Sequence, residues 1–209
     1  MARPNPRRNT RGNNSPAKTD TSTLRIVGGD WRGRKIPFPA IDGLRPTPDR
    51  IRETLFNWLQ PYIAGARCLD LYTGSGALGL EALSRGAASV TFVDRDSQVI
   101  RQLGENLRLL NCSHGELIQA SADQWLTMQN GAQRQPYDIV FMDPPFRQNR
   151  VSDDCATLVG NGLLAQGAVI YVETESELSD PGVPMEWHEH RHKKAGQVSS
   201  RLYFTAERN

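Results

Sequence analysis

An apolar strand runs directly into a glycine-rich turn and then a helix, and this succession restricts the possible folds more than any other part of the sequence. The segment 68–79, CLDLYTGSGALG, has the G-x-G-x-x-G spacing, with Gly74 and Gly76 in the turn. Such glycines allow a tight turn and let a ligand lie against bare backbone before a helix N-terminus. Asp94 ends the next apolar strand, twenty positions after Gly74, where a carboxylate can hold ribose hydroxyls. The pattern predicts a nucleotide- or nucleoside-binding unit.

The remaining sequence alternates short apolar strands with helical segments, which predicts an α/β fold with a doubly wound sheet. A helix is expected from Pro48 to about residue 59, with Thr47 as its N-cap. Ser97 is expected to cap the helix that follows the second strand. The other expected elements are a helix at 80–84, a helix opening at 121–123, and strands at 90–93, 116–120, 137–142 and 168–172.

The tetrapeptide Asp143-Pro144-Pro145-Phe146 follows the apolar run 137–142. Each proline fixes its own φ angle and lacks an N–H, and the residues before the prolines are biased toward extended backbone. The Asp143 carboxylate and the Pro144 carbonyl can then both point outward as acceptors, with Phe146 offering a flat apolar face. A nucleobase with an exocyclic amine would satisfy all three groups. The alternative reading is an ordinary loop stiffened by prolines.

Two classes of cofactor fit the glycine turn: a dinucleotide, which would make the protein an oxidoreductase, and S-adenosylmethionine. Asp70, four residues before Gly74, favours S-adenosylmethionine, because a carboxylate suits an ammonium group and would repel a pyrophosphate. Asp143 favours it too, since a nicotinamide enzyme has no evident use for the pocket around it.

The D-x-[YF]-x-G-x-G turn, the acid after the second strand and the D-P-P-F tetrapeptide together resemble a class I methyltransferase that acts on an exocyclic amine. Residues 25–35, 43–59, 74–85 and 195–203 narrow the resemblance to the RsmD family, over about residues 24–204. That family methylates N2 of one guanine in 16S ribosomal RNA. The resemblance implies a mostly parallel, seven-stranded, Rossmann-like sheet. It also implies that strands at about 185–192 and 199–205 close the sheet as an antiparallel pair.

The resemblance assigns roles to individual residues. Asp143 and the Pro144 carbonyl would accept the two N–H groups of the guanine amine, and Phe146 would stack on the base, which would be flipped out of its loop. In the cofactor site, Gly74 and Gly76 would lie against S-adenosylmethionine. Asp70 would hold the methionine end of the cofactor, and Asp94 the ribose. Asp123 would accept from the adenine amine or only cap its helix.

Positive charge is concentrated in the N-terminal quarter. Residues 1–52 hold twelve Lys/Arg and four Asp/Glu, whereas residues 53–209 hold thirteen and nineteen. Residues 1–23 are polar and basic and are expected to be a disordered tail. Four basic residues flank a predicted hairpin that turns at residues 28–30 and carries Trp31 near its tip, and they are expected to grip RNA: Arg25, Arg32, Arg34 and Lys35.

The roles of two other groups of basic residues are left open by the sequence. Arg45 would brace the acceptor site or bind a phosphate. Arg147 and Arg150, beside the D-P-P-F loop, are the alternative candidates for binding the RNA. Residues 24–209 are expected to form one domain, with the hairpin and first helix in 24–60 and the S-adenosylmethionine-binding core in 61–209.

The expected protein is a cytoplasmic, monomeric enzyme acting on 16S rRNA within a 30S particle, with no metal and no membrane contact. Its three cysteines are far apart and form no C-x-x-C pair, which indicates reduced, structural residues. The open alternatives are a dehydrogenase, a methyltransferase of another amine such as adenine in DNA or glutamine in a protein, and a non-catalytic RNA-binding assembly factor.

Overall fold

The computed structural model describes residues 21–41, 44, 46–131 and 133–206 of the 209-residue chain. The predicted tail, up to residue 20, and Arg45 lie outside these residues. None of the described helices is long and apolar enough to cross a membrane.

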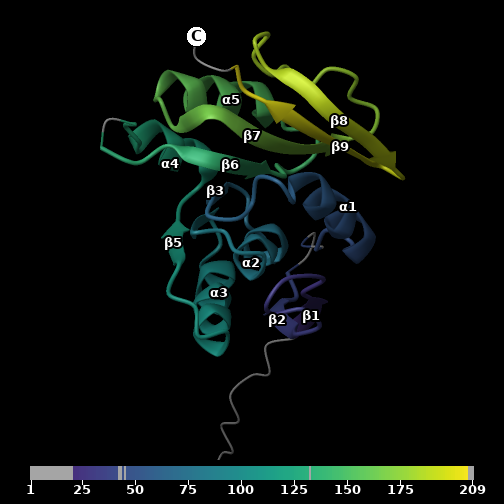
Figure 1. Ribbon diagram of the computed structural model, residues 1–209, viewed down its shortest axis with the longest axis vertical. Helices are drawn as coiled ribbons and strands as arrows, with labels where there is room; N and C mark the ends of the chain where they lie inside the picture. The colour runs from purple at the N-terminus through teal and green to yellow at the C-terminus, as the bar shows by residue number, and fades with distance from the viewer. Residues whose placement is uncertain (1–20, 42–43, 45, 132, 207–209) are drawn as a thin grey trace, which may run out of the picture.

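The centre of the fold is a seven-stranded sheet with the strand order β5-β4-β3-β6-β7-β9-β8 (Figure 1). Strand β9 pairs antiparallel with both of its neighbours, whereas the other pairs are parallel. The predicted mostly parallel sheet with an antiparallel last strand is confirmed. The strands are β3 (Arg67–Asp70), β4 (Ser89–Asp94), β5 (Gly115–Gln119), β6 (Tyr137–Met142), β7 (Leu164–Glu175), β8 (His188–Ala195) and β9 (Val198–Phe204).

Side chains of successive strand residues point to opposite faces of the sheet, and each face carries its own apolar core. Phe141 and Tyr171 belong to the core under α1, α2, α3 and the N-terminal hairpin. Met142 and Val172 belong to the core under α4 and α5. The helices are α1 (Asp49–Leu59), α2 (Ala77–Ser84), α3 (Ser97–Leu109), α4 (Ala122–Met128) and α5 (Arg150–Gly160).

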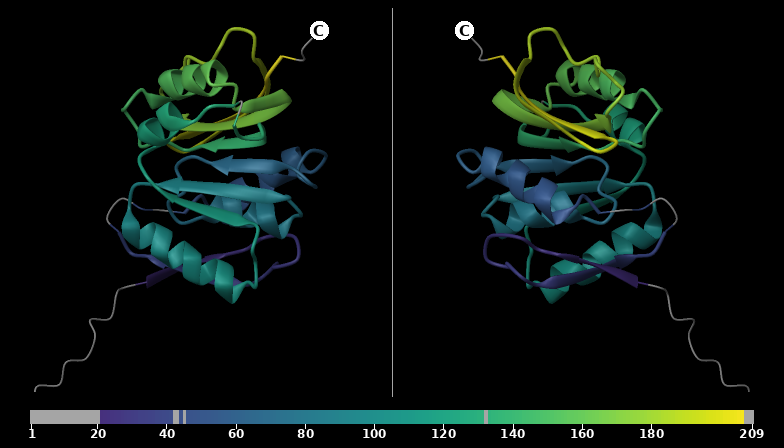
Figure 2. Two further views of the ribbon diagram at one scale, coloured as in Figure 1. Left: turned by 90° about the vertical axis from the view of Figure 1, so that its left-hand side faces the viewer. Right: turned by 90° about the vertical axis from the view of Figure 1, so that its right-hand side faces the viewer.

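The predicted N-terminal hairpin is formed by β1 (Thr21–Arg25) and β2 (Lys35–Pro39), which pair antiparallel. It begins inside the segment assigned to the tail, and its connection spans residues 26–34 rather than a tight turn at 28–30. The hairpin packs beside α3 at one end of the molecule, opposite β8, β9 and α5 (Figure 2). Trp31 is partly buried against the core instead of projecting from a tip.

Several predicted element boundaries were wrong for local reasons. Pro48, not Thr47, occupies the N-cap of α1, and Thr47 is buried. Asp96, not Ser97, caps α3, because its side chain accepts the Gln98 N–H at 2.7 Å. Helix α2 begins at Ala77, before the expected residue 80, and β8 starts three residues later than expected. Helix α5 was not anticipated at all.

Candidate active site

Three aspartates meet at the carboxyl edge of the sheet. Asp70 is the last residue of β3, Asp94 the last of β4, and Asp143 directly follows β6. Strand β3 lies between β4 and β6, and its pairing aligns Asp70 with Phe92 on one side and Phe141 on the other. The chain moves outward from β3 to β5 and then returns to β6 on the other side. Open α/β sheets bind ligands at such a switch point.

The glycine turn between β3 and α2 has the backbone conformation that its sequence predicts. Gly74 and Gly76 have φ angles of +51° and +77°, in the left-handed region that side chains disfavour. Gly79 has a different role, because a Cβ atom there would lie 2.2 Å from the ring of Phe92. The absence of a side chain therefore allows α2 to pack directly on the sheet. The turn and the close packing together bring the N-terminus of α2 to the sheet edge.

Asp70 is buried beneath this turn and binds the start of α2. Its Oδ2 accepts the Gly79 N–H at 3.0 Å, so the carboxylate satisfies one of the free N–H groups of the helix. Burial raises the pKa of Asp70 to about 7, and the nearby charges of Asp143 and Asp94 act in the same direction. The structure therefore gives Asp70 a helix-capping role, and binding a cofactor ammonium group stays a proposal.

Asp94 holds the turn from the neighbouring strand. Its Oδ2 accepts the Gly74 N–H at 2.8 Å, and its Oδ1 accepts the Asp96 N–H at 2.9 Å. Each carboxylate oxygen has a second lone pair. Asp94 is partly exposed, so both oxygens can still accept from a pair of ligand hydroxyls.

Replacing Asp94 by alanine should weaken S-adenosylmethionine binding by about 1–3 kcal/mol, because it removes a charged acceptor and loosens the Gly74 turn. Titration calorimetry measures the change. Asp96→Ala is the matched control: it removes a neighbouring carboxylate that caps α3 and leaves the turn intact. Unchanged affinity in a folded Asp94→Ala variant would remove this residue from the site.

Asp123 lies in the first turn of α4, at the same edge of the sheet, since the Ala120 N–H donates to the Asp94 carbonyl. The Asp123 side chain is exposed, and a hydrogen bond from the Ser121 side chain lowers its pKa. A role at the helix N-terminus is thus visible, and the contact with adenine stays a prediction.

The loop after β6 contains the predicted acceptors, and two of its residues have left-handed backbone angles. Asp143 is partly exposed, Pro144 is buried, and Phe146 is 42% exposed. Desolvation raises the pKa of Asp143 to about 6. Arg147 and Asn149 have positive φ angles of 63° and 50°, which are unfavourable for residues with side chains and cluster at functional sites.

The chain matches the family described as Conserved hypothetical protein 95 over residues 24–204. It is 50% identical over 188 residues to the Ribosomal RNA small subunit methyltransferase D of Escherichia coli K12, covering 90% of this chain and 93% of that protein. The chain belongs to this family. The prediction of the RsmD family is thereby confirmed.

Two further relatives agree with the family assignment. The Ribosomal RNA small subunit methyltransferase D of Haemophilus influenzae is 47% identical over 184 residues, which cover 86% of this chain and 93% of that protein. The solved structure of yhhF from Escherichia coli superimposes with a TM-score of 0.82 at 49% identity, covering 90% of this chain and all of that one.

The residues at the sheet edge fit the S-adenosylmethionine expected of this family. The cofactor carries positive charge on its sulfonium and ammonium groups, and buried or partly buried carboxyl groups surround the turn: Asp70, Asp94 and Asp143. The left-handed glycines provide the bare backbone that a close ligand needs. A pyrophosphate would meet the same acids as like charges, so the donor set fits a cationic cofactor better than a dinucleotide.

The predicted RNA-binding residues of the hairpin do not share one environment. Arg25 forms an ion pair with Asp49 at 2.8 Å, and Arg34 donates to the Leu109 carbonyl at 3.0 Å. Arg32 and Lys35 are exposed, and their side chains form no hydrogen bond or ion pair within the described residues. Arg25 and Lys35 also line a cavity of about 340 Å³ between the hairpin and the start of α1. Within the described part of the chain, no hydrogen bond or ion pair joins any of these residues to the loop after β6.

The sequence interpretation missed Glu173, the acid near the end of β7. The β6–β7 register pairs Met142 with Val172, which places Glu173 beside Asp143. Burial and the charge of Asp143 raise the pKa of Glu173 to about 8. The signal was present, because Glu173 follows the expected strand 168–172 just as Asp143 follows 137–142.

A second missed group connects the glycine turn to α5. The Tyr72 hydroxyl donates to Asp154, and Arg150 donates to the other oxygen of Asp154 at 3.0 Å. Tyr72 lies just before the turn, and Arg150 follows the strained loop. This group therefore joins the predicted cofactor site to the predicted acceptor site.

Proposed function

We propose that this protein transfers a methyl group from S-adenosylmethionine to the exocyclic N2 amine of a guanine in 16S rRNA, within an assembled or assembling 30S particle. Methylation of small-subunit ribosomal RNA with S-adenosylmethionine follows from the family. The finer assignment to guanine N2 is supported by one observation: Asp143 and Pro144 directly follow β6 at the sheet edge, where their carboxylate and carbonyl oxygens could serve as two acceptors.

Bound S-adenosylmethionine supplies a methyl group on a positively charged sulfur. The protein's own groups orient the acceptor: the Asp143 carboxylate and the Pro144 carbonyl each accept one N–H of the amine. These bonds would turn the nitrogen lone pair out of conjugation with the ring, so positioning supplies much of the rate enhancement. The Asp143 carboxylate also stabilises the positive charge that develops on nitrogen, and it can take up the proton that the amine releases. Phe146, exposed beside these acceptors, provides a stacking face for the base.

The substrate context is part of the same proposal. A monomeric, cytoplasmic enzyme would meet its RNA during subunit assembly, where RNA folding and bound proteins present one guanine and hide the others. Transfer from radiolabelled S-adenosylmethionine should be compared between undermethylated 30S particles and protein-free 16S rRNA. If the particles are labelled stoichiometrically and the protein-free rRNA is not, the particle is the substrate. Equal labelling of the two would assign the reaction to free RNA.

Exposed cations of the hairpin should contribute to RNA affinity. Replacing Arg32 and Lys35 together by alanine should make particle binding less dependent on salt. The slope of the logarithm of the binding constant against the logarithm of the salt concentration should fall by the amount expected for about two phosphate contacts. Filter binding over a range of salt concentrations measures it. The matched control removes the same charge from the opposite end of the molecule, with Arg191→Ala and Lys194→Ala. An unchanged slope in the hairpin variant would show that residues outside the hairpin bind the RNA phosphates.

A further inference from the structure

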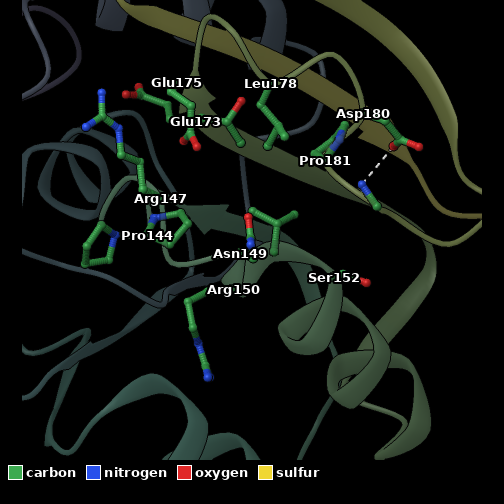
Figure 3. A pocket seen from close by; sticks show the side chains of 14 residues that line it. Pro144, Arg147, Asn149, Arg150, Ser152, Glu173, Glu175, Leu178, Asp180 and Pro181 are labelled. Carbon is green, nitrogen blue, oxygen red and sulfur yellow. Dashed lines mark hydrogen bonds between the residues drawn. The ribbon is translucent and has the colours of Figure 1, made fainter.

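A pocket of about 220 Å³ opens beside the loop after β6, hereafter called the catalytic loop (Figure 3). This loop and the start of α5 form one side of the pocket, and the end of β7 and the residues after it, up to 182, form the other. Pro144 and Pro145 form one wall, and Leu178 and Pro181 form part of the other. Asp143 does not line this pocket, whereas Pro144, the other predicted acceptor, forms part of its wall. The pocket therefore lies directly beside the predicted acceptor site and shares its loop.

Buried groups hold the outer wall in place. Arg201, 2% exposed on β9, donates from Nη2 to the Leu178 and Ser179 carbonyls at 2.9 and 3.2 Å. Its Nη1 donates to the Thr174 hydroxyl at 3.1 Å. The Gly182 N–H donates to Asp180 at 2.8 Å, the dashed line in Figure 3, and fixes the turn that follows. A buried arginine bonded to loop carbonyls keeps this wall ordered, so the pocket is formed in advance of any ligand.

The opposite wall is fixed by the strained loop and by α5. Arg147 and Asn149 hold their left-handed backbone angles, and Arg150 is tied to Asp154. Figure 3 shows the Arg150 guanidinium directed away from the pocket and the Arg147 guanidinium at its rim, on the side of Glu175. Arg147 forms no hydrogen bond or ion pair with any described residue, so its charge is available to a ligand.

A buried carboxyl group also lines the pocket. Glu173 is buried, and the Tyr171 hydroxyl donates to its Oε1 at 2.5 Å. Within the described part of the chain, no donor reaches Oε2, while Glu173 lines the pocket. The pocket thus combines apolar walls, the buried acceptor Glu173 and the unpaired cation Arg147 at its rim, together with the acids Glu175 and Asp180. A ribonucleotide has the matching parts: a flat base, an N–H edge and a phosphate.

We propose that this pocket binds the nucleotide next to the methyl acceptor in the substrate RNA. Its base lies between Pro144–Pro145 and Leu178–Pro181, its N–H edge faces Glu173, and its phosphate faces Arg147. The proposal rests on the proposed function, because the flanking nucleotide of a flipped acceptor must lie close to the catalytic loop. A pocket filled by the neighbour would fix the register of the RNA and help to select one acceptor among many.

The test measures binding of undermethylated 30S particles to the enzyme saturated with S-adenosylhomocysteine, so its readout does not require methyl transfer. Arg147→Ala should raise the dissociation constant roughly tenfold, as expected for loss of a charged phosphate contact. Arg101→Ala, which removes an exposed arginine from α3, is the matched control and should stay near the parent. Cofactor affinity should be the same in all three proteins.

A second arm tests the base contact. Particles reconstituted with an abasic residue on one side of the acceptor should bind the parent enzyme several-fold more weakly, and Leu178→Ala should remove most of that difference. The proposal would be overturned if Arg147→Ala bound particles as tightly as the parent. It would also be overturned if the losses of affinity from Leu178→Ala and from the abasic residue were fully additive, whichever side of the acceptor the abasic residue is on. A parent enzyme that binds particles with this pattern but methylates none of them would instead contradict the proposed function.

Discussion

Replacing Asp143 by alanine should lower the rate of methyl transfer by at least roughly a hundredfold while leaving S-adenosylmethionine affinity within about threefold of the parent. The separation is expected because Asp143 follows β6, whereas the acids predicted to face the cofactor, Asp70 and Asp94, end β3 and β4. Single-turnover transfer to undermethylated particles measures the first effect, and calorimetry measures the second.

Asp143→Asn is the matched control, because it keeps one acceptor oxygen and the shape of the side chain while removing the charge and replacing the other oxygen by an NH₂ donor. Its rate should lie between those of the parent and the alanine variant. Near-parental turnover in Asp143→Ala would mean that the amine is oriented by other groups.

The raised pKa of the Asp143 carboxyl group predicts that the rate of methyl transfer depends on pH. Desolvation raises the pKa of Asp143 to about 6, and Glu173 and Asp70 are the carboxyl groups beside it on the neighbouring strands. The ionised form is the active one, so transfer should be full above that pKa and should fall about tenfold per pH unit below it. Asp143→Asn should lose this acidic limb, and its persistence in that variant would assign the limb to another group.

Replacing Glu81 by alanine should destabilise the fold by about 3–5 kcal/mol, because it breaks a buried ion pair and leaves its partners uncompensated. Glu81 is fully buried on α2 and binds the hairpin and two arginines at once. Its Oε2 accepts the Val27 N–H at 2.9 Å and lies 3.3 Å from Arg52, while its Oε1 accepts from Arg85 at 2.8 Å.

The matched control is Asp49→Ala, which removes the other acidic partner of Arg52. The Asp49 side chain is 41% exposed, so solvent screens its ion pairs and the loss should be about 1 kcal/mol or less. Urea denaturation compares the two free energies of unfolding. A Glu81→Ala variant as stable as Asp49→Ala would show that the buried network contributes little.

The parts of the site that the sequence predicts are those fixed by backbone chemistry. Gly74 and Gly76 adopt the left-handed angles that their spacing indicates, and Asp70, Asp94 and Asp143 meet because parallel strands end at one edge. These relations depend only on local sequence and strand direction, so they can be read without knowing which side chains touch.

The parts that were missed depend on tertiary contacts. Glu173 was overlooked because the expected strand 168–172 stopped short of it, whereas β7 runs from Leu164 to Glu175. Arg201 and Arg52 look like ordinary surface residues in the sequence, yet both are buried and bind carbonyls or acids from distant segments. The hairpin cations also differ in ways that composition does not reveal, since Arg25 and Arg34 are engaged and Arg32 and Lys35 are not.

Analysis of the methylated nucleoside tests the central claim most directly. Undermethylated 30S particles are incubated with the enzyme and labelled S-adenosylmethionine, and the 16S rRNA is then digested to nucleosides for chromatography and mass spectrometry. The proposed function predicts one labelled product, N2-methylguanosine, at close to one per particle. Label in a different nucleoside or in ribosomal protein, or no transfer by an enzyme that binds both cofactor and particle, would contradict it.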